Sequence, residues 1–346
     1  MKLLDLCFEE ITELILNCGQ PKYRAQQLYQ GLQAGKKIEE INIPKDLINY
    51  FKDNGFSVGG VEIYEKFISK LDGTIKYLYK LEDGNIIEGV LMKYKYGNTL
   101  CVSTQVGCRM GCAFCASTIG GLVRNLSAGE ILGQVIAANR DNLDDETRGV
   151  TNIVLMGSGE PLDNYDNVLK FLKLVTSKEG LNISMRNISL STCGIVPKIY
   201  ELAKEKLGIT LSLSLHAPDD ELRKTIMPIS KAYKLKDTID AMRQYVKATG
   251  RRVVFEYALI SGVNDTKECA MKLSKLTKGM QCHINLIPLN SVDESGLNGS
   301  DQSRVKTFKS ILEDLGVSVT VRREMGADIS GACGQLRRSY LKKEDL

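Results

Sequence analysis

Residues 107–115 read Gly-Cys-Arg-Met-Gly-Cys-Ala-Phe-Cys, which places three cysteines in one short loop. The apolar run before this loop, residues 100–106, predicts a β-strand. Structural zinc requires four protein ligands in a closed shell, and the bacterial ferredoxin pattern has another spacing with a fourth cysteine before proline. Three thiolates can bind one side of an iron–sulfur cubane and leave one iron open. The spacing therefore predicts Cys108, Cys112 and Cys115 as ligands of a 4Fe–4S cluster with one vacant corner.

The sequence around this loop alternates between short apolar runs and segments with helical periodicity. Helical patterns such as residues 167–175, 235–248 and 303–315 separate the predicted strands, and Ser127 and Glu130 form a capping box at the first helix. A series of strands that are each followed by a helix implies a parallel sheet, closed or partly closed as a barrel. The chemistry of such barrels lies at the carboxyl ends of the strands. The predicted strands are residues 100–106, 152–156, 187–190, 210–215, 253–259 and 283–287, with 317–322 at the end.

The segment before the barrel has a different character. Residues 1–57 contain short helical patterns that end at glycines or start at prolines. Residues 58–98 alternate between apolar and polar positions and contain two hairpin signals, Asp72-Gly73 and Asp83-Gly84, so a β-meander is expected. We therefore expect an α/β protein with a partial (β/α)6 barrel over 99–337, an N-terminal helical accessory domain over 1–57, a meander over 58–98 and a charged tail over 338–346.

Composition limits the class of protein. The 346 residues are 43% hydrophobic and 25% charged, as in an ordinary globular protein. No run of about 18 apolar residues is present, and the N-terminal apolar run contains acidic residues, unlike a secretory signal. We expect a cytoplasmic protein with no membrane partner, in which ten cysteines form no disulfide framework. The net charge of +4 permits an RNA partner without requiring one.

The cysteine loop after the first strand of a β/α barrel resembles the signature of the radical S-adenosylmethionine enzymes. This resemblance implies that S-adenosyl-L-methionine chelates the fourth iron and is cleaved by the reduced cluster to a 5′-deoxyadenosyl radical. Residues 157–161, Gly-Ser-Gly-Glu-Pro, are similar to the glycine-glutamate-proline cofactor loop of that family, although Ser158 stands where relatives often have methionine. As a bare pattern this stretch is equally compatible with a turn before a helix.

Small polar residues also end the other predicted strands, where ribose and carboxylate oxygens need partners. His216 is one of two histidines, and a hydrogen-bonding role is preferred for it over acid–base work. The residues expected to bind the cofactor are Gly159, Glu160, Ser191, Ser214, Leu215, His216 and Asn290.

Six further cysteines divide into two groups. Cys333 lies between small residues, where a thiolate is accessible to an electrophile such as a sulfonium methyl. Cys101 precedes the cluster loop by seven residues and could form a transient disulfide with Cys333; two buried thiols is the alternative. The other four of these cysteines lie in apolar-periodic segments and are expected in the core: Cys7, Cys18, Cys269 and Cys282.

A second, more specific resemblance covers residues 20–337. The chain is similar to the radical methyltransferases that modify adenine in RNA, and in particular to those acting at adenine carbon 2 of 23S rRNA and tRNA. The matching segments are residues 99–103, 124–126, 159–162, 214–218, 285–288 and 321–336.

The resemblance implies a two-cysteine mechanism. Cys333 accepts a methyl group from one S-adenosylmethionine. A radical made from a second S-adenosylmethionine then removes a hydrogen atom from this S-methyl group, and the resulting carbon radical adds to the adenine. Cys101 then attacks Cys333, and the disulfide releases the methylated base. Glu88 matches the proton acceptor of the family, although alternation alone would make it an outward residue of a strand. Radical addition suits adenine carbon 2, which has no acidic proton and is a poor nucleophile.

Two alternatives remain. A related resistance enzyme methylates carbon 8 of adenine in rRNA, but such relatives tend to have alanine where this chain has Pro161. A zinc-stabilised, non-catalytic RNA-binding protein, with Cys101 as a distant fourth ligand, belongs to another class. For the enzyme we expect a monomer with 23S rRNA and tRNA substrates gripped by the N-terminal region, and an electron donor such as flavodoxin or ferredoxin.

Overall fold

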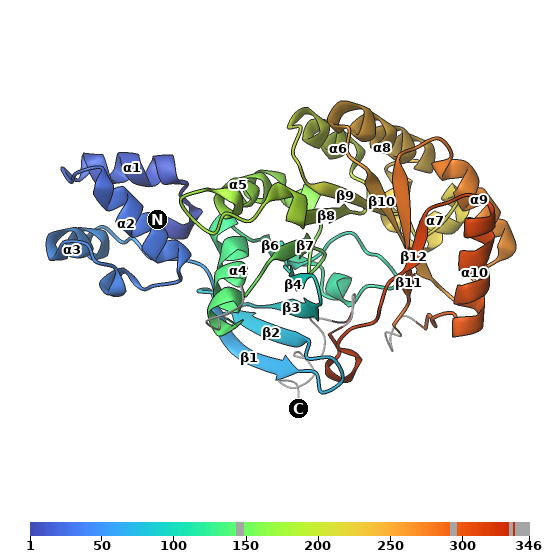
Figure 1. The fold of residues 1–346 in the computed structure, drawn as a ribbon, viewed down its shortest axis with the longest axis horizontal. Coiled ribbons are helices and arrows are strands. Elements are labelled where there is room, and N and C mark those ends of the chain that lie inside the picture. Colours follow the sequence, from blue (N-terminus) through green and yellow to red (C-terminus); the bar gives the residue numbers. More distant parts are fainter. Residues whose placement is uncertain (143–148, 291–295, 332–334, 336–346) are drawn as a thin grey trace.

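One twisted sheet organises the chain in the computed structural model, which describes residues 1–142, 149–290, 296–331 and 335 (Figure 1). Its strand order is β1-β2-β3-β4-β7-β8-β9-β10-β11-β12. β1, β2, β3 and β4 pair antiparallel, and from β4 onward every pairing is parallel. The strands are β1 Glu62–Ile68, β2 Ile75–Lys80, β3 Ile86–Tyr94, β4 Gly97–Cys101, β7 Asn152–Leu155, β8 Ile188–Thr192, β9 Thr210–Ser214, β10 Val253–Leu259, β11 Cys282–Pro288 and β12 Val319–Val321.

Helices follow the parallel strands and cover the outer side of the sheet (Figure 1). Their amphipathic patterns bury aliphatic residues, and polar caps define their starts: Asp219, Thr266 and Asp301 each accept from a backbone N–H of the first turn. The expected fold class, α/β with a partial radical-enzyme barrel, is confirmed. The helices of this region are α4 Ala128–Asn142, α5 Tyr165–Thr176, α6 Val196–Lys204, α7 Asp220–Ile226, α8 Leu235–Thr249, α9 Lys267–Thr277 and α10 Gln302–Asp314.

The N-terminal helices lie at one end of the molecule, away from the barrel (Figure 1). They are α1 Phe8–Asn17, α2 Tyr23–Gln33 and α3 Lys45–Asp53. The chain before them is attached to α4, where Asp5 accepts from Gly129 N at 2.6 Å and Lys2 pairs with buried Glu130 at 3.0 Å. Gly133 is needed at this junction because a Cβ there would lie 2.7 Å from Gly60 Cα.

Short 3-10 turns complete the described secondary structure. They are Leu3–Asp5, Ile38–Glu40, Ala116–Thr118, Pro161–Asn164, Met185–Asn187, Pro228–Lys231 and Ala327–Ile329. Within the described ranges, no helix has the length and apolar character required to cross a bilayer.

The structure differs from the expected first strand in one respect. β4 ends at Cys101, and the chain then turns because Thr104 N and Gln105 N both donate to Ser158 O. The continuation, β5 Gln105–Gly107, pairs antiparallel with β6 Leu122–Asn125 in a separate two-stranded sheet. The cysteine loop is therefore held at both ends by one small sheet.

The meander is continuous with the barrel sheet through β3 and β4, where Val90 pairs with Cys101. The segment after β12 returns to this meander. Met325 packs against Val90, Met92 and Cys101, and Gly326 N donates to Asp72 at 2.9 Å. A chain segment more than 200 residues away thus covers one face of the meander.

Acid should weaken this attachment of the C-terminal segment. Burial alone would raise the pKa of Asp72, but donation from Gly326 N and Thr74 N holds it at about 2. Because this folded-state pKa lies below the ordinary value, the ionised carboxylate stabilises the fold above about pH 4, and the contribution disappears as pH falls toward 2. We expect Asp72→Asn to unfold at lower urea concentration than the parent at pH 5, with the difference shrinking by pH 2.5.

Asp53, at the end of α3, provides the matched control, since Asp53→Asn should leave the urea midpoint nearly unchanged at both pH values. A constant difference between parent and Asp72→Asn across this pH range would contradict the proposed attachment.

Candidate active site at the mouth of the barrel

The cysteine loop has a defined conformation of its own. Cys115 N donates to Cys112 O at 3.1 Å, and the Thr118 hydroxyl donates to Cys115 O at 2.9 Å. Between the two cysteines, Ala113 N donates to Ile226 O at the end of α7, at 2.9 Å. The loop is therefore braced by a helix that follows β9, almost 115 residues later in the chain.

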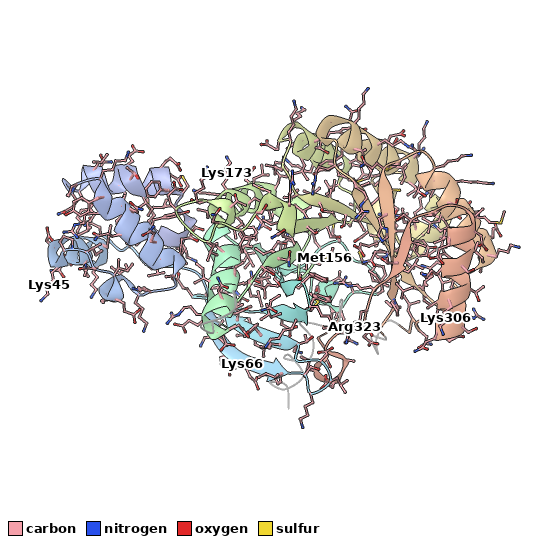
Figure 2. The ribbon with its side chains drawn as sticks, in the orientation of Figure 1. Lys45, Lys66, Met156, Lys173, Lys306 and Arg323 are labelled. Atoms are coloured by element: carbon pink, nitrogen blue, oxygen red, sulfur yellow. The ribbon has the colours of Figure 1, made fainter. Side chains whose placement is uncertain are left out.

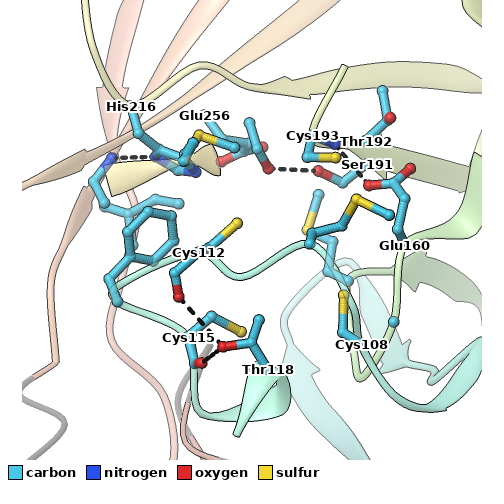
Figure 3. A pocket seen from close by; sticks show the side chains of 18 of the residues that line it. Cys108, Cys112, Cys115, Thr118, Glu160, Ser191, Thr192, Cys193, His216 and Glu256 are labelled. Atoms are coloured by element: carbon cyan, nitrogen blue, oxygen red, sulfur yellow. Dashed lines mark hydrogen bonds between the residues drawn. The ribbon is translucent and has the colours of Figure 1, made fainter. Parts of the chain in front are cut away.

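A pocket opens at the carboxyl ends of the parallel strands, with a volume of about 910 Å³ that includes space open to solvent. Figure 3 shows Cys108, Cys112 and Cys115 on one side of it and Glu160, Ser191 and His216 on the other. Met156, at the centre of the molecule in Figure 2, is also part of its wall. The expected cofactor and cluster residues that line it are Cys108, Cys112, Cys115, Gly159, Glu160, Ser191, Ser214 and His216.

The three thiols lie on one side of the pocket, where they could bind an iron–sulfur cluster. In a cubane each thiolate binds its own iron, so its ligands are spread around a larger group. Burial raises the pKa of Cys108 to about 12, so this thiol stays protonated until a metal displaces its proton. Cys101 lies elsewhere, against Val90, Met92 and Met325.

Glu160 is held in place by backbone donors. Its two carboxylate oxygens accept from Cys193 N at 2.7 Å and from Leu162 N at 3.0 Å. The preceding Gly159 has a φ of +107°, and a Cβ there would lie 2.6 Å from Gln105 Cβ, so only glycine fits. Burial raises the pKa of Glu160, and the donation from Cys193 opposes this. Each oxygen keeps a lone pair with which to accept from an ammonium group.

His216 is a neutral hydrogen-bonding group. Its Nδ1 accepts from Ala258 N at 2.9 Å, which leaves Nε2 as the protonated nitrogen. Burial, followed by the charge of Arg223, lowers the pKa of His216 to about 3. Nearby, the hydroxyls of Ser191 and Ser214 lie 3.4 Å apart. These three side chains offer donors and acceptors to a polar ligand at the edge of the pocket.

Two of the expected cofactor residues do not line this pocket. Leu215 is fully buried, and its backbone N–H and C=O are bonded to Glu256 O and to the Arg223 side chain. Asn290 lines a second cavity of about 420 Å³, which it shares with Met92 and with residues of the C-terminal segment. The two cavities adjoin, because Ile287 and Arg322 line both.

Glu88 lies on the same face of β3 as Val90 and Met92, against which Met325 packs. It is 2% exposed. Neither carboxylate oxygen has a hydrogen-bond partner in the described part of the chain. Burial raises the pKa of Glu88 to about 8, and the positive charge of Lys76 opposes the rise. Alternation alone suggested an outward residue, and the structure instead buries it.

The other expected cysteines are placed as follows. Cys101 is buried at the end of β4. Cys333 lies outside the described residues, two positions after Gly331. Cys269 is buried, whereas Cys7, Cys18 and Cys282 are half-buried around the core rather than fully inside it.

Sequence reasoning missed two residues that line the pocket and one that lies behind its wall. Cys193 follows β8, and its backbone N–H fixes Glu160. Glu256 lines the pocket from β10 and accepts from Asn285 at 2.8 Å. Arg223 lies behind the wall and is fully buried. Of these three residues, only Glu256 could have been found from the sequence, because a lone carboxylate within the apolar run 253–259 is unusual for a buried strand.

Comparisons with known proteins agree with this geometry. Residues 102–273 match the model of the Radical SAM superfamily. Two curated relatives, each called a probable dual-specificity RNA methyltransferase RlmN, are 54% identical (Thermoanaerobacter sp. strain X514, 99% of each chain) and 50% identical (Clostridium novyi strain NT, 98% of each chain). The crystal structure of a radical SAM methyltransferase from Sphaerobacter thermophilus has a TM-score of 0.90 and 40% identity, covering 97% of this chain and 99% of that one.

The barrel, the three-cysteine loop and the pocket define a radical S-adenosylmethionine enzyme, which uses a 4Fe–4S cluster and S-adenosylmethionine. Within that superfamily the chain belongs to the RlmN family of RNA methyltransferases. Membership of this family removes the alternative of a zinc-stabilised, non-catalytic RNA-binding protein.

Proposed function

We propose that this chain methylates carbon 2 of adenine in 23S rRNA and in tRNA. The observation that carries the proposal is one pocket formed by the three cysteines and Glu160, adjoining a second cavity bordered by the C-terminal segment. Full-length identity of 50–54% with relatives named for dual specificity supports both substrates. Pro161 favours carbon 2 over carbon 8, since the resistance-type relatives tend to have alanine at this position.

The pocket fits both cofactors by the chemistry of its groups. Cys108, Cys112 and Cys115 would hold the cluster, and the buried carboxylate of Glu160 would bind the ammonium of S-adenosylmethionine. The remaining polar contacts would come from Ser191, Ser214 and His216, with Asn290 reaching in from the adjoining cavity. When bound, these cofactors would supply a transferable methyl group and a 5′-deoxyadenosyl radical.

Three residues of this chain would then have separate roles in the reaction. Cys333 would carry the methyl group as a thioether and present it to the adenine, and Cys101 would attack the Cys333 sulfur to free the product. Glu88 would accept the proton lost from carbon 2. Support comes from the attachment of Met325 and Gly326 to the meander, which brings the C-terminal segment against Cys101.

The remaining assignments concern partners. The N-terminal helices and the meander would grip folded RNA, which proteins recognise largely by shape. The electron would come from a flavodoxin or ferredoxin, and the protein would act in the cytoplasm as a monomer.

Labelling with deuterated cofactor tests the proposed mechanism. Anaerobically reconstituted enzyme is incubated with RNA and S-adenosylmethionine carrying a fully deuterated methyl group. Because one deuterium is removed from the methyl on Cys333, the product should be 2-methyladenosine with two deuterons, identified by mass spectrometry against 2-methyl and 8-methyl standards. The variant Cys333→Ala should give no product.

Retention of all three deuterons would mean direct displacement and contradict the proposal. An 8-methyladenosine product with two deuterons would keep the radical route but refute the assignment of carbon 2.

A further inference from the structure

Arg223 is a fully buried arginine in helix α7, behind the wall of the cluster pocket. Its guanidinium makes four hydrogen bonds, all to uncharged oxygens. The acceptors are Leu215 O at 3.0 Å, Ser230 Oγ at 2.9 Å, Cys193 O at 2.7 Å and Ser214 O at 3.0 Å. A buried arginine with this set of partners keeps its positive charge without a hydrogen-bonded carboxylate.

The four bonds join the segments that build the pocket. Cys193 O belongs to the loop after β8, and the N–H of the same residue fixes Glu160 at 2.7 Å. Two further acceptors lie at the end of β9, directly before His216. The same helix ends at Ile226, whose carbonyl accepts from Ala113 within the cysteine loop. Arg223 therefore lies where the cluster loop and two cofactor loops meet.

Burying the charge of Arg223 without a nearby anion has a high desolvation free energy. Burial lowers the pKa of Arg223, but a guanidinium stays charged at neutral pH. Cys112, an expected cluster ligand, packs against the buried group that contains Cys193, and the carbonyl of Cys193 accepts from Arg223 at 2.7 Å. The negative charge of three thiolates exceeds the positive charge of an oxidised cubane core, so the cluster with its ligands has a net negative charge. Reduction adds a further negative charge. An anion of this kind beside Cys112 would compensate the guanidinium.

We propose that Arg223 is a positioning residue that aligns the loops after β8 and β9 with the cysteine loop and provides the buried countercharge of the reduced cluster. The inference rests on the cluster that defines the superfamily and not on the position methylated in RNA. It can therefore fail while the proposed function stands, and the reverse also holds.

A redox titration of the reconstituted holoenzyme, followed by electron paramagnetic resonance without RNA, tests the countercharge. Arg223→Met removes the charge and keeps an unbranched side chain. At a fixed applied potential we expect its ratio of reduced to oxidised cluster to fall at least about tenfold, which equals about 59 mV for one electron. Arg223→Lys keeps the charge, so its ratio should stay close to that of the parent.

Binding of S-adenosylmethionine to the oxidised holoenzyme tests the positioning role. Lysine cannot supply the planar fork of donors that joins the two loops, so Arg223→Lys should bind the cofactor at least about tenfold more weakly. Arg243 gives the matched control, because it also donates to backbone carbonyls, of Leu276 and Lys278, but is exposed on α8. Arg243→Met should change neither the redox ratio nor cofactor binding.

Each outcome decides part of the proposal. An Arg223→Met holoenzyme with an unchanged redox ratio would overturn the countercharge, and unchanged cofactor binding by Arg223→Lys would overturn the positioning role. If Arg223→Met does not fold, judged by circular dichroism and iron content, the lysine variant decides: a parental redox ratio supports the charge role, and a tenfold fall contradicts it.

Discussion

Replacing Cys112 with alanine should abolish RNA methylation while the protein remains folded. The side chain lies in the pocket wall, where the cysteine loop meets the end of α7, and it packs against Cys193, Ala217, Ile226 and Met227. Loss of one of the three proposed protein ligands should prevent stable assembly of the cluster, which is the expected source of the radical. We expect methylated product to fall to the assay background and iron and sulfide to fall well below four per chain.

The fold should tolerate this change better than the activity does. Removing one half-buried sulfur from this loop costs about 1–3 kcal/mol of unfolding free energy, less than the stability of a typical domain. Cys18→Ala, at the half-buried end of α1, is the control and should retain full cluster content and activity. Methylation by a Cys112→Ala protein that lacks iron would remove the cluster from the mechanism and undermine the assignment of the pocket.

The cysteine loop could be predicted because its chemistry is local. Three thiols within eight residues are close in any fold, and the strand–helix alternation behind them requires a parallel sheet. The loops ending in Glu160, Ser191, Ser214 and His216 were predictable for a related reason. Carboxyl ends of parallel strands share one edge of the sheet, so residues there meet whatever the details of packing.

The residues that sequence reasoning missed are defined by tertiary contacts. Arg223 stands in the polar run 219–224, which has the composition of a solvated helix surface, and only the fold shows that its side chain points inward. Cys193 has no characteristic spacing from the other cysteines, and its role lies in a backbone N–H. Leu215 and Asn290 show the converse: both follow the expected strands, but one is enclosed in the core and the other faces a neighbouring cavity.

Glu88 illustrates the same limit for a strand. Its alternation with apolar neighbours is that of an outward position, and the opposite face of β3 does carry buried Ile87 and Leu91. Both faces are nevertheless buried, and Met325 packs against Val90 and Met92 on the outward one. A pattern within one strand cannot reveal a cover supplied more than 200 residues later in the chain.

Replacing Glu88 with glutamine should reduce methylation by about 10²–10⁴-fold, the usual contribution of a positioned general base. In the parent enzyme the rate should rise about tenfold per pH unit up to pH 8 and then level off, since only the ionised carboxylate can accept a proton and its pKa is about 8. Single-turnover rates between pH 6 and 9 provide the measurement. The residual rate of Glu88→Gln should not depend on pH in this range, and Glu62→Gln, at an exposed position on β1, should retain the parental profile.

The same substitution should make the fold more stable as the enzyme becomes less active. The folded-state pKa of Glu88 lies above the ordinary value of a glutamate, so folding favours the neutral form, and parent stability declines as pH rises from about 4 to 8. The decline is at most about 1.4 kcal/mol per pH unit, and a neutral glutamine does not share it. Urea unfolding of Glu88→Gln should match the parent near pH 5 and exceed it at pH 8. If Glu88→Gln and the parent were equally stable at both pH values, the ionised carboxylate would be solvated at little cost in the folded protein. The raised pKa of Glu88 and its role as proton acceptor would then have to be abandoned.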